Sequence, residues 1–111
     1  MNATLYHNPR CSKSRAALAL LTGAGAAVTI IDYLGQPPTP AELARRYARA
    51  GMTPREGLRM AEPAARALAD AGDAAILAAM ATDPILIERP LVETDKGVVL
   101  ARPPERVHTI L

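Results

Sequence analysis

The sequence predicts a small α/β domain in which a βαβ unit is followed by a helical insertion and then by a ββα unit. Two short β-branched or aromatic segments, at residues 4–6 and 28–33, flank a helical pattern. A strand, a crossover helix and a second strand form a right-handed unit with parallel strands. A hairpin pattern near the C-terminus adds an antiparallel pair. Together they predict a small mixed sheet.

The first three elements are marked by side-chain pattern and by glycine. Thr4–Tyr6 is a short strand, and the helical pattern from Ser12 to about Ala24 places its leucines and alanines on one side. Gly23 and Gly25 are helix stop signals. The second strand, Val28–Tyr33, is rich in β-branched residues and therefore favours an extended conformation.

The middle of the chain predicts an all-helical insertion at about residues 40–82. Thr39 followed by Pro40 and Glu42 is typical of a helix N-terminus, and later helical segments are separated by glycines. We expect four short helices there: Pro40–Ala50, Pro54–Met60, Glu62–Ala71 and Asp73–Ala81.

The last third of the chain predicts three strands and a helix. Ile85–Ile87 is an apolar strand candidate, and a hairpin follows with strands Leu91–Glu93 and Val98–Ala101 joined by the turn Asp95–Gly97. A final helix starts at Pro103. We expect one domain over residues 1–111.

Composition excludes several classes of function. The chain has 111 residues, 50% of them hydrophobic, which suits one core. A net charge of +2 without a basic run, and only 3% aromatic residues, argue against nucleic-acid binding. The apolar stretch Ala16–Ala27 is too short and interrupted to span a bilayer, so we expect no membrane insertion.

The two histidines and the single cysteine narrow the chemistry further. His7 and His108 lie near opposite ends of the chain without metal-ligand spacing, so no metal is expected. One cysteine rules out an internal disulfide and suits a reducing compartment, so we expect the cytoplasm.

Cys11 lies where the first strand turns into a helix, inside the segment YHNPRCSKSR of residues 6–15. Unpaired backbone N–H groups and the helix dipole favour a thiolate there, and the thiolate is the nucleophilic form. Arg10, Lys13, Arg15 and His7 add cationic character. The same environment attracts an oxyanion. Cys11 is therefore predicted to be a reactive thiol in an anion pocket.

The order of elements, with a cysteine after the first strand, resembles the thioredoxin-like fold. Three motifs resemble the glutathione/glutaredoxin-coupled arsenate reductase family, in its chromosomal branch: residues 6–15, the segment ILIERP of residues 85–90, and the segment ARPPE of residues 101–105. The resemblance covers essentially the whole chain. The segment after the expected oxyanion-binding Arg59 departs from many relatives, because it has no tyrosine.

The resemblance implies a role for seven residues. Cys11 attacks arsenate, His7 helps to keep the thiol ionised, and Ser14 places a hydroxyl near the sulfur. Pro90 is the structural cis-proline. The oxyanion is surrounded by three arginines, which are Arg59, Arg89 and Arg102.

The resemblance also implies the partners. Attack by Cys11 on arsenate gives a thiol–arsenate adduct that a second thiol must resolve, and this chain has no second cysteine. Glutathione supplies that thiol as co-substrate, glutaredoxin clears the mixed disulfide, and arsenite leaves. No bound cofactor is expected, and we expect a monomer that serves arsenical resistance.

There are three alternatives to this function. One is a glutathione-linked thiol oxidoreductase that acts on another oxyanion or a protein mixed disulfide. Another is a non-catalytic RNA polymerase-binding regulator of the same superfamily, but such regulators carry a CxxC switch and this chain has Ser14 at the fourth position. The phosphatase-type reductase needs a C-x5-R loop, and Ala17 stands at that arginine position.

Overall fold

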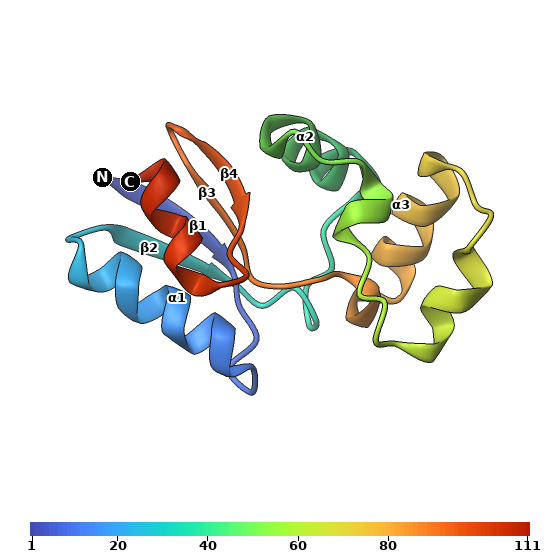
Figure 1. The fold of residues 1–111 in the computed structure, drawn as a ribbon, viewed down its shortest axis with the longest axis horizontal. Coiled ribbons are helices and arrows are strands. Elements are labelled where there is room, and N and C mark those ends of the chain that lie inside the picture. Colours follow the sequence, from blue (N-terminus) through green and yellow to red (C-terminus); the bar gives the residue numbers. More distant parts are fainter. The chain divides into compact units, whose positions relative to one another are not determined.

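The computed structural model describes all residues, 1–111, and the chain divides into two compact units. The sheet unit comprises Met1–Tyr33 and Arg89–Leu111, and the helical unit comprises Leu34–Glu88 (Figure 1). The helical unit contains the insertion predicted at about residues 40–82. It is inserted between Tyr33 and Arg89 of the sheet unit.

The sheet unit is built on a four-stranded mixed sheet with strand order β2-β1-β3-β4. The strands are β1 (Asn2–Tyr6), β2 (Ala27–Ile31), β3 (Leu91–Thr94) and β4 (Gly97–Leu100). β1 pairs in parallel with β2 and antiparallel with β3, and β3 pairs antiparallel with β4. The predicted βαβ unit and hairpin are therefore confirmed.

The helix α1 (Ser12–Gly23) and the C-terminal 3-10 helix η4 (Pro104–Ile110) pack together on the sheet (Figure 1). Ala17 and Leu21 of α1 are buried one turn apart, and they meet alternate residues of the strands, as the periods of helix and strand require. No helix of the chain is both long and apolar enough to cross a membrane. The buried core consists of Ala3, Leu5, Ala17, Leu21, Val92, Val99, Ala101, Val107 and Ile110.

The strand register brings three chain segments to one end of the sheet. Tyr6 at the end of β1 pairs with Leu91 at the start of β3, which pairs with Leu100 at the end of β4. Just beyond that row, the Ala101 N–H donates to the Pro90 carbonyl at 2.9 Å. The segments that follow β1, precede β3 and follow β4 therefore start from the same edge.

The helical unit begins with two capping boxes. The Thr39 hydroxyl accepts from the Glu42 N–H at 3.1 Å, and the Thr53 hydroxyl accepts from the Glu56 N–H at 3.3 Å. Each hydroxyl thus pairs with a backbone amide that would have no partner in the first turn of its helix. The helices of this unit are α2 (Pro40–Ala50), η1 (Pro54–Gly57), η2 (Pro63–Leu68), α3 (Asp73–Thr82) and η3 (Pro84–Leu86).

The strand predicted at Ile85–Ile87 is wrong. Pro84 starts the 3-10 turn η3, whose Pro84 carbonyl accepts from the Ile87 N–H at 3.0 Å. Ile87 then forms only an isolated antiparallel bridge with Leu58, inside the helical unit. A short apolar run with a leading proline satisfies its backbone locally, so Leu86 and Ile87 are buried without entering the sheet, while Ile85 is exposed.

Other boundaries also differ from the predictions. The second strand ends at Ile31 and not at Tyr33. The helices predicted at Pro54–Met60 and Glu62–Ala71 are shorter 3-10 helices, and the C-terminal helix is also 3-10. Each of these pieces begins with proline and spans few residues, which is the setting in which 3-10 geometry competes with the α-helix.

Candidate active site

Cys11 closes a tight turn between β1 and α1. Its N–H donates to the Asn8 carbonyl at 2.9 Å, and the Arg10 N–H donates to the Asn8 side-chain oxygen at 3.0 Å. Asparagine followed by proline favours such a turn, because the side chain binds backbone two residues on. Cys11 itself is the N-cap of α1, with φ −95° and ψ 120°. The sulfur therefore stands at the helix N-terminus, as predicted.

The surroundings of the Cys11 thiol lower its pKa. Burial raises its pKa, but the backbone N–H of Ser14, the charge of Arg89 and the backbone N–H of Lys13 lower it, and a hydrogen bond from the Arg89 side chain lowers it further. The net pKa lies below that of an ordinary cysteine. The side chain is only 8% exposed. Helix amides and one arginine thus favour the nucleophilic form over the protonated thiol.

His7 and Ser14 form a buried pair beside this turn. His7 Nδ1 and Ser14 Oγ are 2.6 Å apart, and Ser14 Oγ also accepts the Asn8 N–H at 3.0 Å. Since Oγ already accepts one hydrogen bond from the backbone, a neutral imidazole can accept the hydroxyl proton at Nδ1. The pair links the end of β1 to the first turn of α1.

The surroundings of His7 disfavour the positive charge that the sequence leads us to expect of this ring. Burial lowers the pKa of His7, and the charge of Arg15 lowers it further. Both effects favour the neutral form of the ring. The hydrogen bond between His7 and Ser14 gives the ring a way to support the Cys11 turn that needs no charge on the ring.

Arg89 and Arg102 flank the β3–β4 hairpin at the end of the sheet where Cys11 lies. Both precede a cis-proline: the Arg89–Pro90 and Arg102–Pro103 peptide bonds are cis. Arg102 Nη1 donates to the Arg89 carbonyl at 2.9 Å, so the two segments are joined directly. The Arg89 side chain also lowers the pKa of Cys11, through its charge and through a hydrogen bond to the sulfur. The sheet unit alone thus contains Cys11, Arg89 and Arg102.

Comparison with known proteins identifies the family of the chain. The sequence profile of the ArsC family matches residues 6–110. The chain belongs to the ArsC family. It is 44% identical to the arsenate reductase of Rhizobium meliloti over 115 residues, covering 100% of this chain and 82% of that protein. It is 40% identical to the arsenate reductase of Escherichia coli, with 99% and 81% covered.

Solved structures give the same result for the fold. The arsenate reductase from Vibrio cholerae matches this ArsC-family chain with a TM-score of 0.94 and 42% sequence identity, covering 100% of this chain and 98% of that one. A putative arsenate reductase from Yersinia pestis matches with a TM-score of 0.90 at 38% identity, covering 97% and 99%. The thioredoxin-like α/β fold predicted from the sequence is therefore confirmed.

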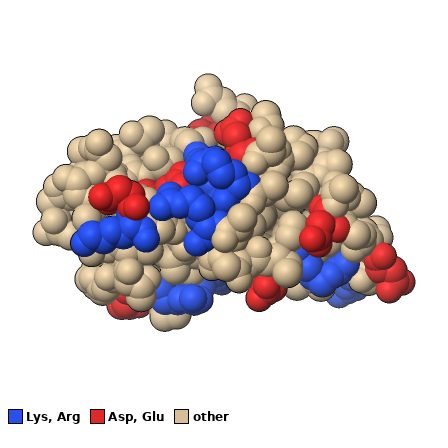
Figure 2. Space-filling model, turned by 90° about the horizontal axis from the view of Figure 1, so that it is seen from above, with Lys and Arg blue, Asp and Glu red and all other residues tan.

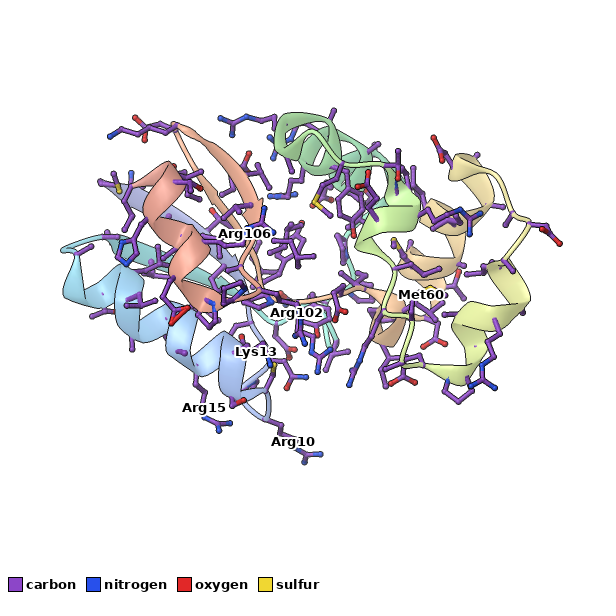
Figure 3. The ribbon with its side chains drawn as sticks, in the orientation of Figure 1. Arg10, Lys13, Arg15, Met60, Arg102 and Arg106 are labelled. Carbon is purple, nitrogen blue, oxygen red and sulfur yellow. The ribbon has the colours of Figure 1, made fainter.

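Arg59 belongs to the helical unit of this ArsC-family chain. Its backbone is fixed by the bridge between Leu58 and Ile87, where the Arg59 N–H donates to the Leu86 carbonyl at 2.7 Å. Its Nη1 lies 3.6 Å from Glu62 Oε1, and its buried Nε has no hydrogen-bond partner. The neighbouring Met60 is exposed (Figure 3). An oxyanion-binding role for Arg59 stays a prediction.

Two residues that the sequence analysis does not assign to the site, Asn8 and Arg15, hold the Cys11 turn of this ArsC-family chain through hydrogen bonds. Asn8 supplies a carbonyl, an N–H and a side-chain oxygen to the turn, and the Asn-Pro dipeptide was the signal for it. Arg15 reaches back from α1 to the Pro9 carbonyl at 2.8 Å. No local pattern identifies that bond, because it joins residues six positions apart around a turn.

Charge and metal-ligand chemistry elsewhere are unremarkable. Lys and Arg side chains are interspersed with Asp and Glu on the face shown in Figure 2. No group of three or more His, Cys, Asp or Glu side chains is placed to hold a metal ion.

Proposed function

We propose that this protein is an arsenate reductase that converts arsenate to arsenite with Cys11 as nucleophile. The observation that carries the proposal is the thiolate-favouring environment of Cys11, with Arg89 acting on its sulfur. Full-length similarity of about 40% to proteins named arsenate reductase supports the substrate. Neither observation depends on the other.

The arginines address the electrostatic problem of the reaction. Arsenate is anionic at neutral pH and repels a thiolate, so its oxygens must be neutralised before sulfur and arsenic can approach. We assign this task to Arg89, Arg102 and Arg59, because planar guanidinium groups bind oxyanions through paired N–H donors. A charge-assisted hydrogen bond of this kind contributes roughly 1.5–3 kcal/mol. His7 and Ser14 support the turn that carries Cys11.

The chemistry balances with one protein thiol and one external thiol. The Cys11 sulfur bonds to arsenic(V), and one arsenate oxygen leaves as water after protonation. A second thiolate then attacks the Cys11 sulfur and forms a sulfur–sulfur bond with it. The sulfur–arsenic bond breaks, and its electron pair stays on arsenic, which is reduced from arsenic(V) to arsenic(III). Arsenite is released, and Cys11 is left in a mixed disulfide. Two thiols are oxidised and one arsenate is reduced by two electrons.

The second thiol has to come from outside, since Cys11 is the only cysteine. We assign it to glutathione, with glutaredoxin reducing the mixed disulfide. Both assignments rest on the resemblance to the glutaredoxin-coupled family. They place the protein in a reducing compartment that contains glutathione, and we propose the cytoplasm.

A coupled assay tests this function. Purified protein is mixed with arsenate, glutathione, glutaredoxin, glutathione reductase and NADPH, and NADPH consumption is followed. Wild type and Cys11→Ser are compared, and each is checked for its fold by circular dichroism. We expect saturable activity that requires arsenate and glutathione, with at least a hundredfold loss in Cys11→Ser because the nucleophile is gone.

Two controls sharpen the assay. Phosphate in place of arsenate keeps the charge and shape of the anion but offers no reducible centre, so NADPH consumption should stop. Omission of glutaredoxin tests the partner separately from the substrate. Activity in folded Cys11→Ser would disprove the mechanism. Folded wild type with a reactive thiol but no arsenate-dependent activity would leave the alternative of a thiol oxidoreductase for another oxyanion or a protein mixed disulfide.

A further inference from the structure

The central peptide of the Asn8–Cys11 turn is held at both ends. This peptide joins Pro9 to Arg10. Its N–H, from Arg10, donates to the Asn8 side-chain oxygen at 3.0 Å, and its carbonyl, from Pro9, accepts from Arg15 Nη1 at 2.8 Å. The first bond is local to the turn. The second bond ties the turn to the first turn of α1.

Rotation of a central peptide is the usual way in which such a turn changes its conformation. A flip of this peptide converts type I geometry into type II, which requires a positive φ at the third residue of the turn. The third residue here is Arg10, and no non-glycine residue in the chain has a positive φ. A flip would also break both bonds to the Pro9–Arg10 peptide. The Arg15 contact therefore opposes the main alternative conformation.

Arg15 makes one hydrogen bond to Cys11 itself and one to the turn before it. Its backbone N–H donates to the Cys11 carbonyl at 3.0 Å, as the first bond of α1, while its side chain binds the Pro9 carbonyl two residues before Cys11. Cys11 is at once the last residue of the turn and the N-cap of the helix. One side chain thus fixes how the turn joins the helix.

We propose that Arg15 is a positioning residue, whose guanidinium locks the Pro9–Arg10 peptide and so holds the Cys11 sulfur against the helix amides. For its effect on turnover this inference rests on the proposed function, but its effect on the thiol does not. The amides of Ser14 and Lys13 are the groups that depend on this alignment, since they favour the thiolate only while the sulfur stays at the helix N-terminus.

A second contribution of Arg15 concerns His7. After burial, the charge of Arg15 is the cause that lowers the pKa of His7. A neutral ring can accept the Ser14 hydroxyl proton at Nδ1, whereas a protonated ring would have to donate there. Arg15 therefore supports the same turn through a bond to Pro9 and through its charge near His7.

The chain offers a matched control for this experiment. Arg10 and Arg15 are both exposed arginines, and both point away from the sheet next to the Cys11 turn (Figure 3). Arg10→Met removes a positive charge beside Cys11 but leaves the Arg15–Pro9 bond, whereas Arg15→Met removes a charge and the bond. The pKa of the thiol is obtained from the pH dependence of Cys11 alkylation by iodoacetamide, which needs no arsenate.

We expect Arg15→Met to raise the pKa of Cys11 by about one unit, because a sulfur that drifts loses part of its stabilisation by amides. Arg10→Met should shift it clearly less. Equal shifts in the two variants, or no shift in Arg15→Met, would overturn the proposal. The histidine NMR resonances test the second part: the pKa of His7 should rise in Arg15→Met, and an unchanged His7 titration would refute that part.

The same variants separate this inference from the proposed function. If the wild type reduces arsenate, Arg15→Met should show a lower kcat at pH 7 that recovers as the pH is raised, because more of the thiol ionises. If the wild type does not reduce arsenate, the alkylation and NMR results still decide whether Arg15 positions Cys11.

Discussion

Arg102 binds the backbone of Arg89 across the open end of the β3–β4 hairpin, with Nη1 at 2.9 Å from the Arg89 carbonyl. The Arg89 side chain in turn donates a hydrogen bond to the Cys11 sulfur. Cys11, Arg89 and Arg102 are therefore linked in a row at one end of the sheet. The strand register produces this edge, because Tyr6, Leu91 and Leu100 are paired neighbours.

Replacing Arg102 should weaken catalysis in two ways. Arg102→Met removes a proposed oxyanion ligand and the tether of the Arg89 carbonyl. We expect kcat/KM for arsenate to fall by about 10–100-fold, which corresponds to one lost charge-assisted hydrogen bond. Initial rates in the coupled assay measure it. The control is Arg106→Met, an exposed arginine of η4. A kcat/KM unchanged from wild type in Arg102→Met would contradict both roles.

Replacing Arg89 should change the thiol itself. Arg89 lowers the pKa of Cys11 through its charge and through a hydrogen bond. Arg89→Met should therefore raise that pKa, by about one unit, so that at a given pH below both values roughly tenfold less thiolate is present. The alkylation rate at pH 6 should drop accordingly and should recover at high pH. An alkylation profile identical to that of wild type would exclude Arg89 as a stabiliser of the thiolate.

Arg59 should behave differently from Arg89. We expect Arg59→Met to raise KM for arsenate through the loss of one guanidinium, by about tenfold or more. The pKa of Cys11 should stay as in wild type, because the groups that shift it all belong to the sheet unit. Arg66→Met, an exposed arginine of the same helical unit, is the control. If KM is unaltered in Arg59→Met, Arg59 is not an oxyanion ligand.

The core of the candidate site could be predicted from sequence because its parts are local. The turn before Cys11 and the helix after it follow from neighbouring residues, and a hairpin necessarily brings Arg89 and Arg102 together at its open end. The family resemblance then added roles that spacing alone does not give. The confirmed fold follows from the same local patterns.

The remaining features depend on tertiary contacts. The lowered pKa of His7 depends on burial and on Arg15, whereas the sequence shows only a histidine among cations. The apolar residues 85–87 have the composition of a strand, but their backbone pairs with the segment around Leu58, about 30 residues away. A local pattern contains no information about either partner.

The pKa of His7 predicts how stability depends on pH. Burial, followed by the charge of Arg15, lowers this pKa in the folded chain from its ordinary value of 6.5. Between the two values the unfolded chain binds more protons than the folded chain, so the free energy of unfolding falls as the pH decreases below about 6.5. Urea unfolding at several pH values between 5 and 7.5 measures it.

A pair of histidine variants assigns this effect. His7→Gln should reduce the slope of unfolding free energy against pH, while His108→Gln, at an exposed position of η4, should keep it. Only the slopes are compared, because loss of the contact with Ser14 lowers the stability of His7→Gln at every pH. Equal slopes in wild type and His7→Gln would show that His7 is not the responsible group.

The close contact between Gly57 and Tyr47 predicts that a larger side chain at position 57 destabilises the helical unit. A Cβ at Gly57 would overlap the ring of Tyr47, which is buried and whose hydroxyl lies 3.8 Å from Met80 Sδ. The ring cannot move freely because it is packed in the core of this unit. Gly57→Ala should therefore lower the free energy of unfolding by about 1–3 kcal/mol, the usual cost of overpacking.

The segment beyond Gly57 makes this substitution informative for activity as well. The Gly57 carbonyl accepts from the Glu88 N–H at 2.8 Å, and this pairing also fixes the backbone of Arg59 two residues later. We therefore expect Gly57→Ala to raise KM for arsenate while the pKa of Cys11 stays unchanged. Gly23→Ala is the control, because nothing lies within 4 Å of a Cβ placed there. Unfolding curves and KM values that match between the two variants would show that the contact between Tyr47 and Gly57 does not constrain Arg59.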